Sequence, residues 1–283
     1  MVSEPLGERE RERTLARARD YPYAAAGTSF ALISGREYAV SRPEGTGEAL
    51  DLTRARARDP DTGRELPLSD LLDPDALRAR VPVLAYGANR SPEALERKRS
   101  LPGLPADSAI VVLRARLHDL DVVYSAHLSA YGSVGATLQR SAGTSAEVSV
   151  LLLTQSQLAA LGETEPNYTL EELRDVAVEI EGGARLDHVS AYVSRHGCLT
   201  LQGAEVALAA IPSHRRRFRA LTQPEVLGAV AARLGHGGAL DEFILENVAD
   251  PELAAERTRE LRRDARRLEA RSPAAASRAA PPL

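Results

Sequence analysis

The chain has 283 residues, of which 43% are hydrophobic and 27% charged, and its formal net charge is −4. This size fits one ordinary domain with appendages, or two small domains, without disulfides or a structural metal. The slightly negative charge argues against a dedicated nucleic-acid binder. Lys98 is the only lysine, so Schiff-base, pyridoxal phosphate and P-loop chemistry would each depend on that one position.

Residues 1–80 are predicted to form a partly ordered N-terminal extension. The first residues alternate acidic and basic side chains and contain no apolar run of the kind that a secretory signal has. A short apolar patch at 30–33 and an amphipathic helix at 69–80 are the predicted elements here. No run of the chain approaches the length of a membrane span, and the single cysteine, Cys198, permits no intrachain disulfide. We therefore expect a soluble, cytoplasmic protein.

The region 81–234 is rich in predicted strands. The run VPVLAY at 81–86 is a strand that ends at Gly87, and Ser91-Pro92 is a typical helix start. Further strands are predicted at 110–117, 121–125, 134–139, 147–153, 175–180 and 188–194. Many short strands with few helices between them favour a curved sheet or small barrel over a parallel doubly wound sheet.

Helix boundaries in the second half follow from capping patterns. Thr154 with Gln157 begins a short helix at 155–161 that Gly162 closes. The pair Thr222 and Glu225 begins another that runs to Leu234.

The last part of the chain is predicted to be a helical extension and a tail. Asp250-Pro251 starts a helix over 252–271 within a C-terminal extension, 235–271, and the low-complexity tail, 272–283, is expected to be disordered. The predicted fold class is thus α+β: a small mixed β-barrel of short strands with flanking helices, an N-terminal extension and a C-terminal helix.

Two segments could carry chemistry. The first is the strand–turn–helix passage LAYGANRSPEAL at 84–95, where a glycine after a buried strand allows close approach of a ligand and the helix start presents free N–H groups to an anion. A plain β–α turn is the alternative. The second is LGETEPNY at 161–168, where Glu163 or Glu165 could be a partly buried general base. An exposed acidic turn is the alternative.

Other candidates favour structural roles. The basic run HRRRFRA at 214–220 is expected on a helix, where a solvated face is favoured over a phosphate or nucleic-acid site. The six histidines show no metal-ligand spacing, and Cys198 fits a buried structural thiol. Gly182-Gly183 is predicted to be a hairpin turn, because strands continue on both sides.

The order of the segments resembles that of the gamma-glutamylcyclotransferase-like family. The resemblance covers 81–234, roughly half of the chain: YGANRSPEAL at 86–95 is similar to the family's YGSN loop, and Ala115-Arg116-Leu117 with Asp119 follows in order. The strand Gly135-Ala136-Thr137-Leu138, a short helix, a turn glutamate and a closing IPSHRRRFRAL segment come next. The motifs are short, and their collinearity carries the resemblance.

The resemblance implies an acyltransferase or lyase that cyclises a gamma-glutamyl amine or peptide to 5-oxoproline and releases the amine. It implies Glu165 as the catalytic general acid/base, four residues after Leu161. The implied substrate-binding residues are Tyr86, Gly87, Ala88, Asn89 and Tyr168. One carboxylate and several N–H donors suffice for this reaction, so no cofactor and no metal are expected.

This sequence departs from the family pattern in two places, Ala88 in the loop and Pro166 after the glutamate. These departures leave open a second reading, a non-catalytic small-molecule-binding or protein-interaction member of the same fold. The expected partner is a small gamma-glutamyl substrate, with no nucleic acid and no membrane. Self-association through the C-terminal helix is a further expectation. Lys98, among charged neighbours on the helix after the loop, is expected to be a solvated surface residue.

Overall fold

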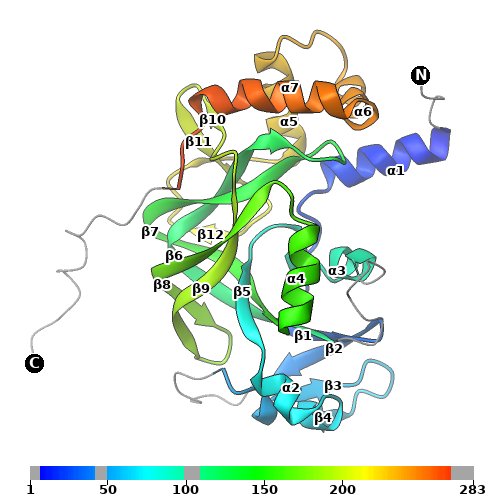
Figure 1. Cartoon of the computed structure of the whole chain (residues 1–283), viewed down its shortest axis with the longest axis vertical. Coiled ribbons are helices and arrows are strands. Elements are labelled where there is room, and N and C mark those ends of the chain that lie inside the picture. The colour runs from blue at the N-terminus through cyan, green and yellow to red at the C-terminus, as the bar shows by residue number, and fades with distance from the viewer. Residues whose placement is uncertain (1–6, 42–49, 99–108, 269–283) are drawn as a thin grey trace, which may run out of the picture.

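A computed structural model describes residues 7–41, 50–98 and 109–268 of the chain. Two very long antiparallel strands dominate it, β6 (Ile110–Leu128) and β7 (Val134–Leu153) (Figure 1). The sequence predicted two short strands in place of each, which is wrong. Asp119 is the reason in β6: it occupies a left-handed conformation at a bulge, and its carboxylate accepts a hydrogen bond from the Gly143 N–H of β7 at 2.7 Å. At a β-bulge the two strands stay paired on both sides of the extra residue, although the sequence at that point resembles a turn.

Five strands close into a barrel. The ring consists of β7, β5 (Val81–Ala85), β9 (Arg185–Ser194), β8 (Tyr168–Ile180) and β6, which pairs again with β7. All neighbours are antiparallel except β5 and β9, which are parallel. The predicted α+β class with a small mixed barrel and flanking helices is therefore confirmed. The predicted hairpin at Gly182-Gly183 connects β8 and β9, with both glycines at positive φ.

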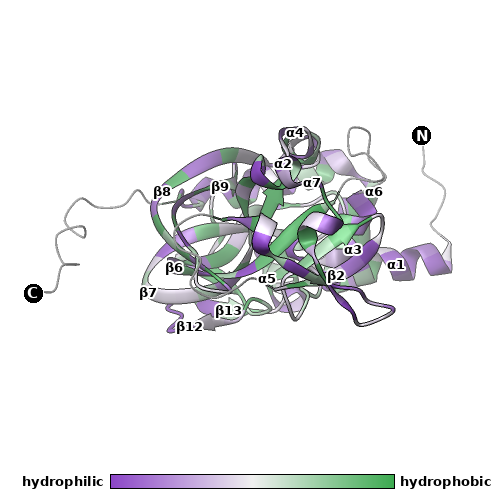
Figure 2. Ribbon diagram, turned by 90° about the horizontal axis from the view of Figure 1, so that it is seen from below, coloured by the Kyte–Doolittle hydropathy of each residue, from purple (hydrophilic) through white to green (hydrophobic). Residues whose placement is uncertain are grey.

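Both faces of the barrel wall are buried near β5. Leu84 and Val150 belong to the large core cluster that fills the barrel, whereas Val83 and Leu151 belong to a second cluster on the outside. The outer cluster lies under α3 (Pro92–Lys98) and α4 (Gln155–Glu163), and each of these helices contributes a buried leucine to it. Burial on two faces explains the continuous apolar run of β5, and hydrophobic residues concentrate on these central strands (Figure 2).

The N-terminal region extends the sheet beyond the barrel. Strand β1 pairs with β6, and β2, β3 and β4 follow it in order. The bounds of this region's elements are α1 (Glu8–Arg19), β1 (Phe30–Ile33), β2 (Arg36–Ser41), η1 (Leu52–Arg54), β3 (Arg56–Arg58), β4 (Glu65–Pro67), η2 (Leu68–Asp70) and α2 (Pro74–Arg78). The patch predicted at 30–33 is β1. The helix predicted at 69–80 is interrupted, because Asp73 caps a new start at Pro74.

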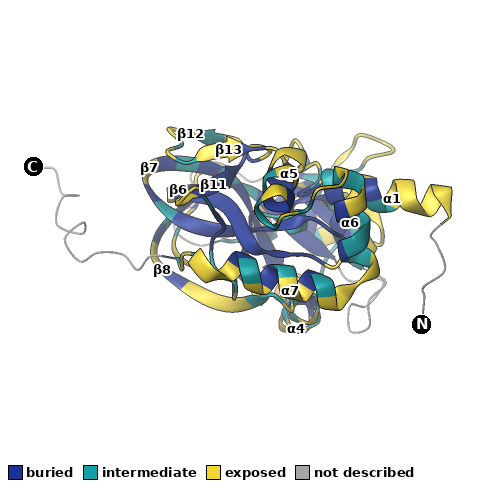
Figure 3. Cartoon of the chain, turned by 90° about the horizontal axis from the view of Figure 1, so that it is seen from above, coloured by how far each residue is buried: buried dark blue, intermediate teal, exposed yellow. Residues whose placement is uncertain are grey.

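Three helices cover one end of the barrel, α5 (Gln223–Arg233), α6 (Leu240–Ala249) and α7 (Pro251–Leu261), with their outer faces exposed (Figure 3). The single helix predicted at 252–271 ends earlier: α7 stops at Leu261, η4 (Arg262–Asp264) follows, and the part from 269 lies outside the described residues, as does the tail. The buried face of α7 packs on β6 of the same chain, where the Thr258 hydroxyl accepts from the Leu128 N–H at 3.2 Å. Self-association through this helix stays a prediction.

The capping patterns correctly located the helix starts. Both predicted capping boxes, at Thr154 and at Thr222, are formed, and Asp250 caps α7. The end of α4 was predicted less well, since the helix passes through Gly162 to Glu163. The proposed boundaries 1–80, 81–234 and 235–271 stay predictions.

The basic run at 214–220 is not helical. It contains parts of two short strands, β12 (Ser213–His214) and β13 (Arg219–Leu221), joined by a turn with Arg215 at positive φ. Arg216 in this turn reaches inward, and its Nε and Nη2 donate to the fully buried carboxylate of Asp121 at 2.9 and 3.1 Å. Pairing with β7 and with β11 (Ala204–Leu208), which itself pairs with β10 (Thr200–Leu201), overrides the helical expectation.

Candidate functional site

A cavity of about 470 Å³ lies where the loop after β5, the end of α3 and the turn before β8 meet. All six residues of the site predicted from the sequence line it: Tyr86, Gly87, Ala88, Asn89, Glu165 and Tyr168. They come from two segments more than seventy positions apart, so the tertiary structure brings them together.

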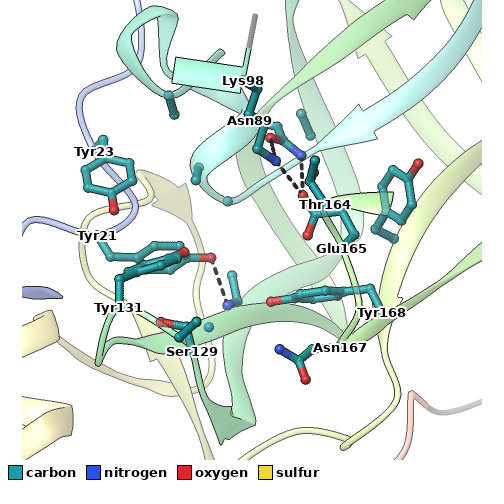
Figure 4. Close-up of a pocket in the computed structure, with 18 of the residues that line it drawn as sticks. Tyr21, Tyr23, Asn89, Lys98, Ser129, Tyr131, Thr164, Glu165, Asn167 and Tyr168 are labelled. Atoms are coloured by element: carbon teal, nitrogen blue, oxygen red, sulfur yellow. Dashed lines mark hydrogen bonds and ion pairs between the residues drawn. The ribbon is translucent and has the colours of Figure 1, made fainter. Parts of the chain in front are cut away.

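Glu165 is held by two side chains (Figure 4). Asn89 Nδ2 donates to Glu165 Oε1 at 3.0 Å, and Lys98 Nζ donates to the same oxygen at 2.8 Å. Lys98 Nζ also donates to Asn89 Oδ1 at 2.8 Å, which closes a triangle. Among the described residues, Oε2 forms no hydrogen bond. The carboxylate is thus fixed through one oxygen, and the other is left for a ligand.

The predicted surface role of Lys98 is wrong. Its side chain is only 19% exposed, and that of Glu165 is 16% exposed. Lys98 is the last residue of α3, nine positions after Asn89, so the helix returns it to the loop that precedes the helix. The charged sequence around it gave no signal of this, because burial of one end of a short helix depends on what packs there.

The turn that carries Glu165 also uses Pro166. The Glu165 N–H donates to the Gly162 carbonyl, and the Tyr168 N–H donates to the Glu165 carbonyl at 3.0 Å, which closes a four-residue turn. Pro166 is at the second position of this turn, where a fixed φ is favourable. Pro166 is thus compatible with this tight turn, and Glu165 and Tyr168 at the two ends of the turn line the same cavity.

The loop after β5 is anchored at both ends. The Tyr86 hydroxyl donates to the Tyr192 carbonyl of β9, and the Ser91 hydroxyl accepts from the Ala94 N–H at the start of α3. A Cβ on Gly87 would lie 2.7 Å from the Tyr21 hydroxyl oxygen, so only glycine permits this approach. The loop is thus hydrogen-bonded to β9 and lies close to Tyr21 of the N-terminal segment.

Six of the eight tyrosines in the chain line this one cavity. They are Tyr21, Tyr23, Tyr86, Tyr131, Tyr168 and Tyr192. Tyr21, Tyr23 and Tyr131 could not be predicted from the sequence, because tyrosines scattered over three regions form no local motif. The Arg17 guanidinium lies 4.7 Å from the Tyr131 ring centre, and that of Arg97 lies 4.6 Å from the Tyr23 ring centre.

The tyrosine hydroxyls remain protonated at neutral pH. Desolvation raises the pKa of Tyr21, Tyr131 and Tyr168 above their ordinary range, and burial raises the pKa of Tyr192 to about 12. The Tyr21 hydroxyl accepts from the Ala136 N–H at 2.9 Å and keeps its own proton for donation. The lining of the cavity is therefore aromatic and contains neutral hydrogen-bond donors.

A neutral histidine lies at the base of the cavity. Burial, with a smaller contribution from stacked His196, lowers the pKa of His127 to about 3. Its Nδ1 lies 2.7 Å from the Ser125 hydroxyl, which in turn lies 2.6 Å from the Ser194 hydroxyl. The ring meets that of Tyr168 edge-on at 5.5 Å.

The remaining candidates lie outside the Glu165 contact network. Glu163 lines the cavity but is exposed, and no hydrogen bond joins these two described residues, Glu163 and Asn89. Cys198 is buried, its thiol donates to the Leu138 carbonyl at 3.4 Å, and it does not line the cavity. Over residues 7–41, 50–98 and 109–268, no cluster of three His, Cys, Asp or Glu side chains is placed to hold a metal ion. None of the described helices is long and apolar enough to span a membrane.

Comparison with known proteins gives distant likenesses only. No family model matches the chain, and neither does any curated protein. One similar solved structure, of an uncharacterized protein from Homo sapiens, has 19% identity and a TM-score of 0.34, over 59% of this chain and 86% of that chain. Another, a gamma-glutamyl cyclotransferase, has 18% identity and a TM-score of 0.33, over 58% of this chain and 86% of that chain. Likeness at this level establishes no activity.

Proposed function

We propose that the protein is a gamma-glutamylcyclotransferase-like enzyme that converts a gamma-glutamyl amine or peptide to 5-oxoproline and the free amine. The observation that carries the proposal is the Glu165 carboxylate, fixed by Asn89 and Lys98 and facing an aromatic cavity. The resemblance of the sequence to that family supports the same reaction. Glu165 is the catalytic residue in this proposal, acting as general acid and base.

The reaction is an intramolecular acyl transfer. The substrate binds folded, so that its α-nitrogen lies against its own γ-carbonyl carbon, and this proximity supplies much of the rate. Glu165 takes a proton from the α-ammonium through its second oxygen, and the freed amine attacks the carbonyl carbon. The C–N bond to the leaving group then breaks. The α-nitrogen gives up two protons in all, and Glu165 passes them to the amine, which departs as an ammonium ion.

The oxyanion of the tetrahedral intermediate needs fixed donors. The short helical turn η3 (Ala88–Arg90) presents its first N–H groups beside the cavity, because the initial donors of a helical turn have no partner within it. We assign Ala88 and Asn89 backbone N–H groups to this role. The loss of the family's serine hydroxyl at position 88 leaves these groups unchanged.

Lys98 is a positioning residue in this proposal. Its ammonium and the Asn89 amide hold one carboxylate oxygen, so Glu165 keeps a single orientation toward the substrate. The reaction requires no covalent adduct on the lysine, since the nucleophile is the substrate's own amine.

The test is incubation of the purified protein with a panel of gamma-glutamyl amides and peptides, followed by mass spectrometry for 5-oxoproline. We expect product from at least one of them, with Glu165→Gln reduced by at least about a hundredfold, the range attributed to general acid–base catalysis. Glu163→Gln is the matched control, an exposed carboxylate in the same turn region, and should retain activity. No product from any substrate, or full activity in Glu165→Gln, rejects the proposal.

A second function also has an observation in its favour. Lys98 forms an ion pair with one oxygen of Glu165, and an ion-paired carboxylate can serve to bind a ligand without transferring protons. A non-catalytic member of the fold would bind a small molecule or partner and release it unchanged. Equilibrium binding of a gamma-glutamyl compound that is recovered intact after long incubation would support this alternative, and turnover that depends on Glu165 would exclude it.

A further inference from the structure

A second cavity, of about 550 Å³, lies away from Glu165. It is lined by residues 25–27, by Ala210 and Pro212, and by residues of β6, β7 and the end of β8. None of its lining residues is shared with the first cavity. Arg90 lines it, directly after Asn89, so neighbouring residues of η3 face two different cavities.

The Arg90 side chain is buried, and it has no direct ion-pair partner among the described residues. The residue is only 9% exposed, and within the described part of the chain its Nε and Nη1 atoms have no hydrogen-bond partner. Among the described residues, no carboxylate lies within 4 Å of its guanidinium. Burial lowers the pKa of Arg90, and the nearby carboxylate of Glu147 opposes that effect. A buried charge in this state is costly unless an anion joins it.

Three carboxylates line the same cavity, and each has another partner. Glu147 and Glu181 face Arg114, with nitrogen–oxygen distances of 3.8 and 3.5 Å, and Glu181 also accepts from the Ser29 hydroxyl at 2.8 Å. Glu179 lies 3.4 Å from His118 Nε2. Glu147 and Glu181 thus share one guanidinium, that of Arg114, and among the described residues none of the three carboxylates lies within 4 Å of the Arg90 guanidinium.

We propose that this second cavity binds a small oxyanion, a carboxylate or phosphate group, with the Arg90 guanidinium as its anchor. The planar guanidinium is the side chain best suited to such groups. Arg114 and Arg116 at the wall add positive charge, although Glu147, Glu179 and Glu181 limit the site to a compact anion that reaches Arg90. The proposal is independent of the activity assigned to Glu165.

The test is calorimetric titration of the full chain with inorganic phosphate and, separately, with acetate, at constant low ionic strength. We expect saturable binding of at least one of them, and the comparison tells a phosphate site from a carboxylate site. Arg90→Met should weaken that binding at least tenfold. Arg185→Met, which removes an exposed arginine outside the cavity, should leave it unchanged.

Two further measurements keep the result interpretable. Thermal unfolding of Arg90→Met should show a folded protein with an unchanged or higher Tm, because a buried charge that lacks a direct ion-pair partner has been removed. Glu147→Gln should tighten anion binding, because it removes a competing carboxylate beside Arg90. Absence of saturable binding to both anions, or wild-type binding by folded Arg90→Met, overturns the proposal.

Discussion

Lys98 Nζ lies 2.8 Å from Glu165 Oε1, although the two residues are 67 positions apart in the chain. The only lysine of the protein thus contacts the carboxylate that the sequence motifs favour as the catalytic group. Asn89 contacts both side chains, so the loop after β5, the helix after that loop and the turn before β8 share one hydrogen-bond network.

Substitution of Lys98 is expected to lower turnover more than binding. In Lys98→Met the carboxylate of Glu165 loses one of its two restraints, and we expect kcat to fall about 10- to 100-fold, as for loss of a positioning contact, with a smaller change in KM. Lys98→Arg should recover part of the loss. Steady-state kinetics on the best gamma-glutamyl substrate measure this, with Arg78→Met as the surface control. Wild-type kcat in Lys98→Met would show that the ion pair has no role in positioning.

Gly135 is expected to tolerate no side chain. A Cβ there would lie 2.5 Å from His127 Cε1 and 2.6 Å from the Tyr168 hydroxyl oxygen, both at the cavity. Gly135→Ala should therefore cost about 1–3 kcal/mol in the free energy of unfolding, the usual cost of overpacking. Denaturant unfolding measures it. Gly228→Ala in α5 meets nothing within 4 Å and should be neutral or stabilising by up to about 1 kcal/mol. Equal effects of the two substitutions would contradict the steric argument.

The pair of Arg216 and Asp121 is expected to stabilise the fold. Arg216→Met would leave a fully buried carboxylate without its partner, and we expect a loss of about 3–5 kcal/mol in the free energy of unfolding. Arg217→Met, in the same basic run, should change stability by less than about 0.5 kcal/mol, as at most surface positions. Chemical denaturation of both variants measures these free energies. Equal unfolding free energies in the two variants would show that Arg216, like the rest of the basic run, is a solvated surface residue, as expected from the sequence.

His127 is expected to contribute to acid instability. Its pKa is about 3 in the folded protein, against about 6.5 for an ordinary histidine. Between pH 3 and pH 6.5, His127 therefore binds a proton in the unfolded chain but not in the folded chain. The contribution of His127 to the free energy of unfolding is fully present above about pH 6.5 and is lost as the pH falls toward 3. At pH 5 this group accounts for a loss of about 2 kcal/mol.

Unfolding free energies at pH 7 and pH 5 test this for the wild type, His127→Gln and His188→Gln. The loss between the two pH values should be smaller in His127→Gln than in the wild type, whereas the exposed His188 should matter little. An identical loss in all three proteins would assign the acid sensitivity to other groups.

The local parts of the fold could be predicted from the sequence. The helix starts at Thr154, Thr222 and Asp250 are fixed by hydrogen bonds between residues two or three positions apart. Such local pairs can be recognised directly in the sequence. The boundaries of β6 and β7 could not be predicted in this way. Aspartate is common in turns, and only the pairing of β6 with β7 shows that Asp119 lies at a bulge within a continuous strand.

The sequence by itself determined the class of fold, the helix caps and the two segments, around Asn89 and Glu165, that line the cavity. Only the tertiary structure placed Lys98 on Glu165, brought Tyr21 and Tyr131 to the same cavity and left Arg90 buried. The physical reason is the range of the interactions. Caps and strand patterns arise between near neighbours, whereas burial and charge pairing depend on segments that are remote in the sequence and meet only when the barrel closes.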